Sequence, residues 1–245
     1  MNQQLVKTND NSNTLFSTKY KQHFHDIRTG AIKESLEKHI IPAFNFHSEK
    51  KELKILDICF GLGYNTFSTI NYIIENKFNK KIEIFSPELD LELIESLKSF
   101  EFPQEFEKIS HIIKKLLETK KYEDENIKID LFIGDARNYI KTLKGIDIVY
   151  QDAFSCDVNS ELWTVEYFKD IYKVTNQNVI ITTYSVASKV RLSLYKAGFF
   201  IYETKIANGR KQTIALKHNK DFIDGKYIDM QLKQQRNKEL KALYD

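Results

Sequence analysis

Residues 55–65 have the sequence Ile-Leu-Asp-Ile-Cys-Phe-Gly-Leu-Gly-Tyr-Asn. An apolar strand pattern ends at Asp57, a turn with two glycines follows, and a helix begins near Tyr64. Glycine lets the backbone of a turn approach a ligand closely and adopt conformations that a side chain blocks. The N-terminus of the following helix offers free N–H groups to an anionic group. The run predicts a ligand-binding strand–turn–helix unit, although a tight turn without a ligand has the same pattern.

Apolar runs typical of buried strands recur along the chain and alternate with helical patterns. Strands are expected at Lys54–Ile58, Lys81–Phe85, Ile127–Ile133, Asp147–Tyr150 and Asn178–Thr183, and helices at Tyr64–Glu75, Leu91–Phe100, Ala136–Leu143, Glu161–Val174 and Ala187–Ala197. This alternation predicts parallel βαβ units in an open sheet with helices on both faces. Two further runs, Phe199–Ile206 and Lys211–Lys217, flank the hairpin signal Asn208-Gly209, which predicts an antiparallel end to the sheet.

Length and composition describe one α/β domain with appended segments. The chain has 245 residues, 42% of them hydrophobic, and a formal net charge of +3. Residues 1–50 are expected to form an N-terminal extension or lid with a helix at Ala31–His39. Residues 51–218 form the main domain, with a helical insertion at about 101–121, and residues 219–245 a polar tail with a solvated helical face. The balanced charge excludes coating of nucleic acid by bulk charge, so such a contact requires a local basic patch.

The chain has the composition of a protein that remains in the cytoplasm. It contains no apolar stretch of 18 residues and no apolar core of a signal peptide, so we expect neither a membrane span nor export. Two cysteines, Cys59 and Cys156, fit reduced thiols better than a zinc cluster. His23 and His25 have no third ligand beside them, so no metal site is expected.

Acidic residues stand where four successive predicted strands end, at Asp57, Glu88, Asp135 and Asp152. Ligands of open α/β sheets bind at this edge. Glu88 is placed to accept hydrogen bonds from ribose hydroxyls, and Asp135 from an adenine amino group. Acids in such places also cap helices, so each one alone has a structural explanation. Four in register favour a nucleoside ligand.

The residues around the glycine turn disfavour a ligand that bears phosphate. A nicotinamide dinucleotide needs a third glycine beside its pyrophosphate, and the bulkier residues 64–66 occupy that place. The Gly-Lys-Ser/Thr of a P-loop is also missing. An adenosine ligand without phosphate, such as S-adenosylmethionine, fits the turn better.

These residues resemble those of class I methyltransferases and, more narrowly, the methyltransferase domain of MnmC, the tRNA 5-methylaminomethyl-2-thiouridine biosynthesis enzyme. The similarity runs from about Thr14 to Lys217 and is carried by Tyr20–Ser35, Leu56–Asn65, Gly134–Arg137, Asp152–Ser155, Glu161–Thr164, Thr183–Ser185, Ala197–Phe199 and Gly209–Lys211. It implies a Rossmann-like α/β fold with a seven-stranded, mostly parallel sheet that has one antiparallel strand, and helices on both faces. It also implies methyl transfer from S-adenosylmethionine to the 5-aminomethyl group of (2-thio)uridine at the tRNA wobble position.

The resemblance assigns a role to each matching residue. The cofactor would be bound by Asp57, Phe60, Gly61, Gly63, Asn65, Glu88, Leu89, Asp135, Ala136, Asp152, Ala153 and Phe154. Glu34, with His25 and Arg28, would close over it, or would serve packing alone. Asp152 would be the catalytic residue, which orients a neutral amine, because an aspartate is a poor base for an alkylammonium.

Contacts with the tRNA anticodon loop are expected from two groups of residues. Tyr184 and Trp163 would stack on the uracil, with core packing as the alternative. Lys189, Arg191, Lys205, Arg210 and Lys211 would form the basic patch, with scattered surface charges as the alternative.

The chain departs from the family at Cys59, where a glycine is usual, and in lacking the FAD-dependent oxidase domain of the bifunctional enzymes. Neither FAD nor a metal is therefore expected as a cofactor. Two other functions remain open: an aminopropyltransferase similar to spermidine synthase, and a non-catalytic RNA-binding protein with the same fold. Cys156 lacks the Pro-Cys motif of covalent pyrimidine methyltransferases. The oligomeric state is undetermined by the sequence.

Overall fold

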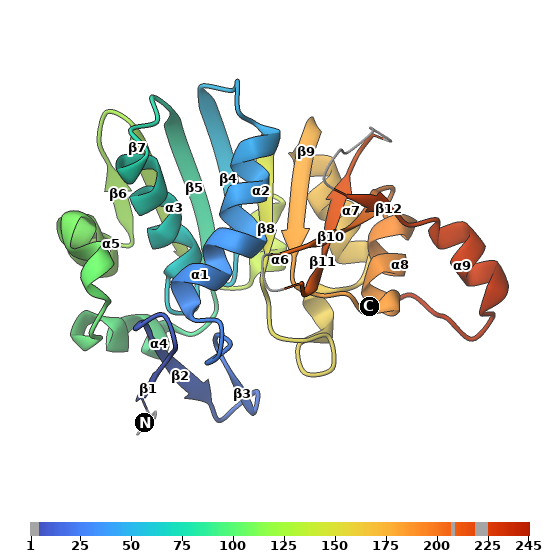
Figure 1. Cartoon of the computed structure of the whole chain (residues 1–245), viewed down its shortest axis with the longest axis horizontal. Helices are drawn as coiled ribbons and strands as arrows, with labels where there is room; N and C mark the ends of the chain where they lie inside the picture. Colours follow the sequence, from blue (N-terminus) through green and yellow to red (C-terminus); the bar gives the residue numbers. More distant parts are fainter. Residues whose placement is uncertain (1–4, 207–208, 219–224) are drawn as a thin grey trace.

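The computed structural model describes residues 5–206, 209–218 and 225–245. At its centre lies a nine-stranded sheet with the order β12-β10-β11-β9-β8-β4-β5-β7-β6 (Figure 1). In chain order these strands are β4 (Glu52–Ile58), β5 (Lys81–Glu88), β6 (Lys121–Glu123), β7 (Ile127–Ile133), β8 (Ile146–Gln151), β9 (Thr175–Thr183), β10 (Phe200–Lys205), β11 (Lys211–Leu216) and β12 (Lys226–Tyr227). Strands β7, β5, β4, β8 and β9 are parallel neighbours, so their carboxyl ends meet at one edge.

The expected fold class is confirmed, and the expected number of strands is wrong. Seven strands form the order β7-β5-β4-β8-β9-β11-β10, in which β11 runs antiparallel to β9. The short strands β6 and β12 extend the two sides, each antiparallel to its neighbour. Strands of three and two residues are too short to show an alternating pattern. The expected β10–β11 hairpin is present, while Ala207 and Asn208 of its turn lie outside the described residues.

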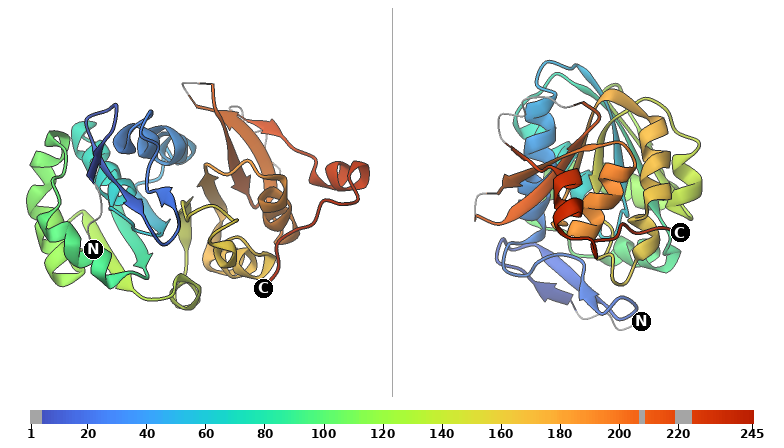
Figure 2. Two further views of the ribbon diagram at one scale, coloured as in Figure 1. Left: turned by 90° about the horizontal axis from the view of Figure 1, so that it is seen from below. Right: turned by 90° about the vertical axis from the view of Figure 1, so that its right-hand side faces the viewer.

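Helices cover both faces of the sheet (Figure 2). One layer contains α1 (Ala31–Ser35), α2 (Ile41–Phe46), α3 (Tyr64–Glu75), α4 (Leu91–Ser96) and α5 (Ser110–Thr119), and the other contains α6 (Ala136–Ile140), α7 (Val165–Val174), α8 (Ser188–Lys196) and α9 (Met230–Arg236). Successive side chains of a strand point to opposite faces. Ile55 and Ile148 therefore lie in the core under the first layer, and Leu56 and Val149 in the core under the second.

The N-terminal residues pack on this domain as two units. The small sheet β1 (Leu5–Lys7), β2 (Asn13–Ser17) and β3 (Gln22–His23) lies beyond the edge where the central strands end (Figure 1). The helix expected at Ala31–His39 is longer than predicted, because α1 continues through the π-helical turn Leu36–Ile40 into α2. Pro42 follows this turn, whose wider path relieves the clash between a proline ring and the carbonyl four residues earlier.

The helix expected at Glu161–Val174 begins later than predicted. Residues 160–162 form a 3₁₀ turn, Trp163 is non-helical, and α7 begins at Val165. The Thr164 hydroxyl accepts a hydrogen bond from the Tyr167 N–H and caps the helix, which a polar residue at this position favours. Further 3₁₀ turns follow α4 at Leu97–Ser99 and precede α5 at Gln104–Ile109, in the segment where a helical insertion was expected.

The last residues of the chain pack against the second helical layer. The Leu243 carbonyl accepts a hydrogen bond from the Val165 N–H at 2.8 Å, and its N–H donates one to the Ser193 hydroxyl at 2.9 Å. Met230 of α9 is buried, while Lys233 and Arg236 are exposed. None of the helices within the described ranges has the length and apolar character needed to cross a membrane.

Candidate active site

A cavity of about 580 Å³ opens at the edge where the parallel strands end, a volume ordinary for a small-molecule site. Twelve of the predicted site residues line it: Glu34, Phe60, Gly61, Asn65, Glu88, Leu89, Asp135, Ala136, Asp152, Ala153, Phe154 and Tyr184. These residues come from five separate loops and from the N-terminal helical segment. The sheet topology therefore gathers residues that are far apart in the sequence, as the register of strand-end acids predicts.

The glycine turn shapes the bottom of the cavity. Gly63 adopts φ +81°, and a Cβ there would meet the Phe67 ring at 2.4 Å, so only glycine fits. Gly63 itself does not line the cavity and acts as the N-cap of α3. Cys59 lines the cavity with φ +65°, a left-handed conformation that costs about 1 kcal/mol for a residue with a side chain. The usual glycine at this position is free of that cost.

Asp57, Asn65 and Asp152 form a hydrogen-bonded row below the cavity. The Asn65 amide donates to Asp152 Oδ2 at 3.0 Å and, at 3.4 Å, to Asp57 Oδ1. Asp57 is fully buried, does not line the cavity, and accepts a further hydrogen bond from the Thr66 hydroxyl at 2.7 Å. Its burial raises the pKa of the Asp57 carboxyl to about 7. Asp57 therefore lies behind Asn65, which stands between it and the cavity.

The neighbouring carboxylate of Asp152 has the opposite electrostatic environment. Burial alone raises its pKa, but charge interactions with His39 and Lys38 and the hydrogen bond from Asn65 outweigh burial and lower the pKa of Asp152 to about 2. The Asp152 side chain is 19% exposed toward the cavity. The two neighbouring carboxyl groups therefore differ: the pKa of Asp152, at the cavity, is lowered, and the pKa of Asp57, behind it, is raised.

Two further acids expected to contact the nucleoside lie at the cavity but already have partners. Glu88 accepts hydrogen bonds from the N–H groups of Gly61 and Asp90, both at 2.9 Å, and so fixes the glycine turn to the end of β5. Asp135 caps α6 through the Arg137 N–H and forms an ion pair with the Arg137 side chain at 2.7 Å. The Arg137 hydrogen bonds lower the pKa of Asp135 despite partial burial.

The N-terminal residues form one side of the cavity, which the sequence did not specify in detail. The Tyr20 ring stacks on Phe154 with 4.5 Å between ring centroids, and the Gln22 amide donates to the Ser155 hydroxyl at 2.8 Å. Glu34 accepts a hydrogen bond from the Asp26 N–H at 2.9 Å and pairs with Lys38. The extension is thus attached to the loop that follows β8.

Tyr184 and Trp163 are placed differently from each other. Tyr184 lines the cavity and donates a hydrogen bond from its hydroxyl to the Ala153 carbonyl at 2.9 Å. The prediction that Trp163 lines the pocket is wrong, because its side chain is fully buried behind Tyr184. Its indole N–H donates to the Phe154 carbonyl at 2.8 Å, so it supports the loop from inside the core.

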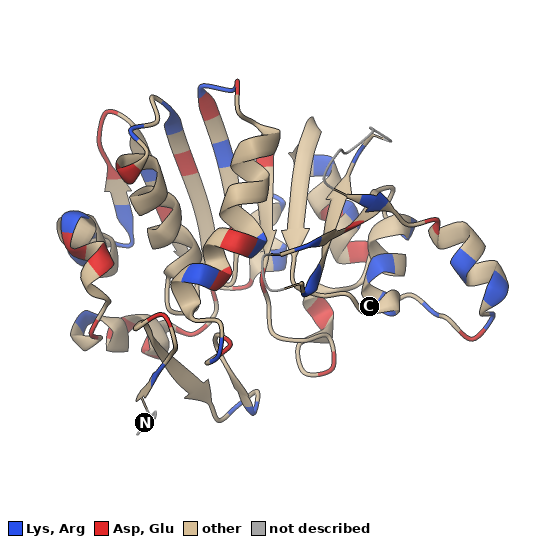
Figure 3. Ribbon diagram, in the orientation of Figure 1, with Lys and Arg blue, Asp and Glu red and all other residues tan. Residues whose placement is uncertain are grey.

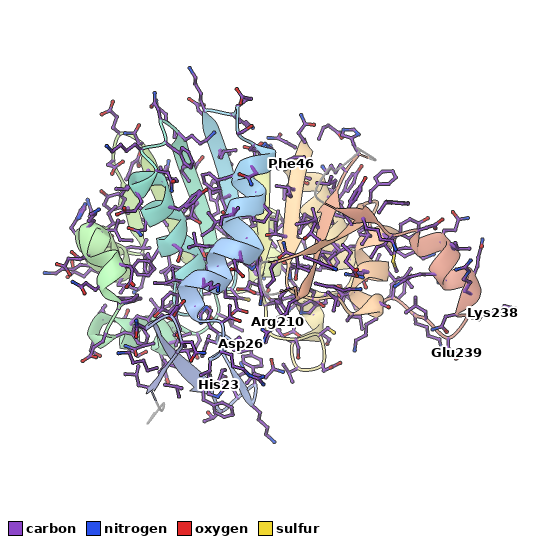
Figure 4. All side chains as sticks on the ribbon, in the orientation of Figure 1. His23, Asp26, Phe46, Arg210, Lys238 and Glu239 are labelled. Carbon is purple, nitrogen blue, oxygen red and sulfur yellow. The ribbon has the colours of Figure 1, made fainter. Side chains whose placement is uncertain are left out.

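Lysines and arginines are spread over the whole ribbon (Figure 3), and the side chains of the predicted basic patch are only partly exposed. Arg191 is 3% exposed and bonded to Glu203 at 3.0 Å, so the prediction that it forms part of a surface patch is wrong. Arg210 is half exposed and pairs with Asp26 (Figure 4), and Lys211 pairs with Glu203 at 2.8 Å. The hydrophobic and hydrogen-bonding context of α8, which decides the burial of an arginine, is not visible in its local sequence.

The polar groups that line the cavity fit S-adenosylmethionine. Asn65 Oδ1 is buried and has no hydrogen-bond partner within the described part of the chain, so an acceptor is available at the foot of the cavity. The carboxylates of Glu88 and Asp135 also line the cavity, and carboxylates are acceptors of the kind that ribose hydroxyls and an adenine amino group need. The cavity is also rimmed by carboxylates and aromatic rings, which suits a sulfonium cation.

Comparisons with known proteins agree with this geometry. A family model described as S-adenosyl-L-methionine-dependent methyltransferase matches residues 101–219. The crystal structure of MnmC2 from Aquifex aeolicus superposes with a TM-score of 0.79 at 32% sequence identity, covering 88% of this chain and 70% of that chain. An uncharacterised protein of Methanocaldococcus jannaschii is 32% identical over 219 residues, covering 87% of this chain and 59% of that protein.

The curated relatives are longer than this chain. The bifunctional tRNA 5-methylaminomethyl-2-thiouridine biosynthesis protein MnmC of Campylobacter jejuni is 26% identical over 231 residues, which cover 86% of this chain and 36% of that protein. The matched region therefore spans 59% of the archaeal relative and about a third of this bacterial one.

Proposed function

Because the chain belongs to the MnmC family of S-adenosyl-L-methionine-dependent methyltransferases, we propose that it methylates the 5-aminomethyl group of (2-thio)uridine at the tRNA wobble position. The product is 5-methylaminomethyl-(2-thio)uridine. The proposal is supported by the names of the MnmC relatives and, in this chain, by one observation above all: the Asp152 carboxylate lines the cavity and is held there by the Asn65 amide at 3.0 Å.

Asp152 suits a reaction in which an amine attacks a methyl group. When bound, S-adenosylmethionine would supply the electrophilic methyl: its S–CH3 bond would break as the N–CH3 bond forms, leaving S-adenosylhomocysteine, and the methylated amine would release one proton to solvent. The Asp152 carboxylate, fixed by Asn65, accepts an N–H of the neutral amine and directs its lone pair toward the cofactor side of the cavity. It then stabilises the positive charge that develops on nitrogen. Alignment of the two reactants contributes several kcal/mol to the lowering of the barrier.

Aromatic and basic groups at the mouth of the cavity suit a nucleotide of an RNA loop. Tyr20, Phe154 and Tyr184 line the cavity and present rings on which a splayed base stacks. Lys19 and Lys21, both exposed, flank Tyr20 on the turn between β2 and β3. Cationic side chains there favour the phosphates on either side of the target base.

The test is nucleoside mass spectrometry of tRNA that carries 5-aminomethyluridine, incubated with the protein and S-adenosylmethionine. We expect that nucleoside to gain one methyl group. Asp152→Asn keeps the shape of the side chain and removes its charge, and we expect it to lower the rate at least about 100-fold. Asp157→Asn, a highly exposed aspartate of the same loop, is the matched control and retains the rate.

Three other results of this experiment would contradict the proposal or part of it. Release of methylthioadenosine in place of S-adenosylhomocysteine would identify an aminopropyltransferase and overturn the proposal. Binding of tRNA with no turnover, on tRNA proved to carry the free amine, would identify an RNA-binding protein and also overturn it. An Asp152→Asn variant as active as the protein itself would remove Asp152 from the mechanism.

A further inference from the structure

The π-helical turn between α1 and α2 places one histidine next to the centre of the site. His39 lies in this turn and is 0% exposed, in a segment that the sequence indicated only as the end of a helix. Short π-helical turns inside α-helices occur most often at functional sites. A regular α-helix would rotate the side chains that follow by about 100° per residue, so the extra residue in the turn decides where His39 points.

His39 contacts the two strands that end at the cavity. Its Nδ1 is 2.7 Å from the Thr182 hydroxyl on β9, and its ring packs 5.4 Å from the Tyr150 ring on β8. Its Nε2 is 3.5 Å from Asp152 Oδ1. That nitrogen is buried and has no hydrogen-bond partner among the residues described, so the carboxylate of Asp152 is the group it faces.

Within the described residues, few charged groups other than His39 lie close to the Asp152 carboxylate. The titratable groups around the pair are Asp57, Cys59, Tyr150, Tyr184, His25, Lys38 and Glu34. The strand β9 and the first turn of α3, which pack against the π-helical turn, contribute uncharged side chains only. Glu34 pairs with Lys38, and the imidazole of His39 lies against the carboxylate, with Nε2 at 3.5 Å from Asp152 Oδ1.

We propose that His39 is a positioning residue, which orients the Asp152 carboxylate through Nε2 while Thr182 fixes the imidazole through Nδ1. The inference rests on the proposed function in one respect, that Asp152 receives the acceptor amine. It adds a buried second group to that site, contributed by the N-terminal segment. Asp152 is then directed from two sides, by Asn65 at Oδ2 and by His39 at Oδ1.

Two substitutions of His39 test the contacts of its two ring nitrogens separately. In His39→Asn the amide reproduces Nδ1 and retains Thr182, but nothing reaches Asp152. In His39→Gln the longer side chain places an amide N–H near the position of Nε2. Neither variant has a side chain that can carry a positive charge. We expect the Asn variant at pH 8 to lose about tenfold or more in kcat with KM for tRNA unchanged, and the Gln variant to remain within about threefold.

A second readout does not require the reaction. With aspartate labelled at its carboxyl carbon, the Asp152 signal is identified by its loss in Asp152→Asn and titrated by NMR. Removing a positive charge at this distance moves a carboxylate pKa up by about one unit or more. We therefore expect the Asp152 midpoint to rise in both His39 variants, and the acidic limb of kcat to move with it.

The two readouts distinguish failure of this inference from failure of the proposed function. If tRNA is not methylated but the Asp152 midpoint rises in the variants, the proposed function fails and the role of His39 stands. If kcat falls equally in both variants while the midpoint is unchanged, His39 only fills space and the inference is overturned. If the Asn variant does not fold, the Gln titration alone decides: an unchanged midpoint overturns the inference.

Discussion

At the scale of one residue, the buried carboxyl of Asp57 lowers the free energy of unfolding when it ionises. The carboxyl is fully buried, and burial raises its pKa to about 7 despite the hydrogen bonds from Thr66 and Asn65. A carboxyl with a higher pKa in the folded than in the unfolded protein destabilises the fold as pH rises. The cost is absent below the unfolded pKa near 4 and complete above the folded pKa near 7.

We therefore expect Asp57→Asn to gain stability relative to the unmodified chain as pH increases from 4 to 7, by up to about 1.4 kcal/mol per pH unit. Urea unfolding of both proteins at pH 5 and pH 7 gives the two differences, in which all other titrating groups cancel. Equal differences at the two pH values would mean that Asp57 does not titrate in this range.

Single residues differ in how well the sequence predicts them. Asp152 was predictable, because the end of a parallel strand fixes its location whatever the rest of the chain does. Arg191 and Trp163 were not, since their burial depends on Glu203 and Phe154, which are brought to them by the tertiary fold. The role of His39 depends on a contact with Thr182, 143 residues away, that no local pattern encodes.

At the scale of an element, the turn before α3 depends on one glycine. In Gly63→Ala the new Cβ would meet the buried rings of Phe67 at 2.4 Å and Phe60 at 2.7 Å, in a left-handed conformation. We expect this variant to lose about 2–4 kcal/mol of unfolding free energy. Thermal or urea unfolding measures the loss.

Gly145→Ala is a matched control for this prediction. Gly145 has φ +73°, nearly the same backbone conformation, but its nearest neighbour is the Asn176 side chain at 3.8 Å. We expect this variant to lose only the cost of the left-handed conformation, about 1 kcal/mol of unfolding free energy. Equal losses in the two alanine variants would show that the rings beside Gly63 rearrange without cost.

Elements were predictable in proportion to their length. Five buried strands and most helices showed their periodicity, because each is long enough to repeat it. The edge strand Lys226–Tyr227 has two residues and forms through pairing with β10. The π-helical turn Leu36–Ile40 has the same composition as an ordinary helix, so only the packed structure shows it.

For the whole molecule, the C-terminal residues stabilise the second helical layer. Leu240, Ala242 and Leu243 pack against its core, and Leu243 bonds to the backbone at the start of α7. We expect removal of residues 240–245 to lower the unfolding free energy by about 2 kcal/mol, through lost apolar burial and the lost hydrogen bonds of Leu240, Leu243 and Asp245. Cofactor affinity, measured by calorimetry, should stay unchanged, because the cavity lies at the edge of the sheet.

Removing only the exposed Tyr244 and the terminal Asp245 is the control for this truncation. The shorter deletion leaves the Leu243 contacts intact, and we expect stability within about 0.5 kcal/mol of the complete chain. A weaker cofactor affinity in the longer deletion would show that the tail also supports the cavity.

The contact between His39 and Thr182 restricts the order in which parts of the molecule can fold. The two residues are 143 positions apart, and contacts closing such long loops form late in folding. On the ribosome the helical segment with His39 is made long before β9, so its binding place does not yet exist. The helical segment can therefore form first, and the nascent protein acquires the contact between His39 and Thr182 only after β9 has been synthesised.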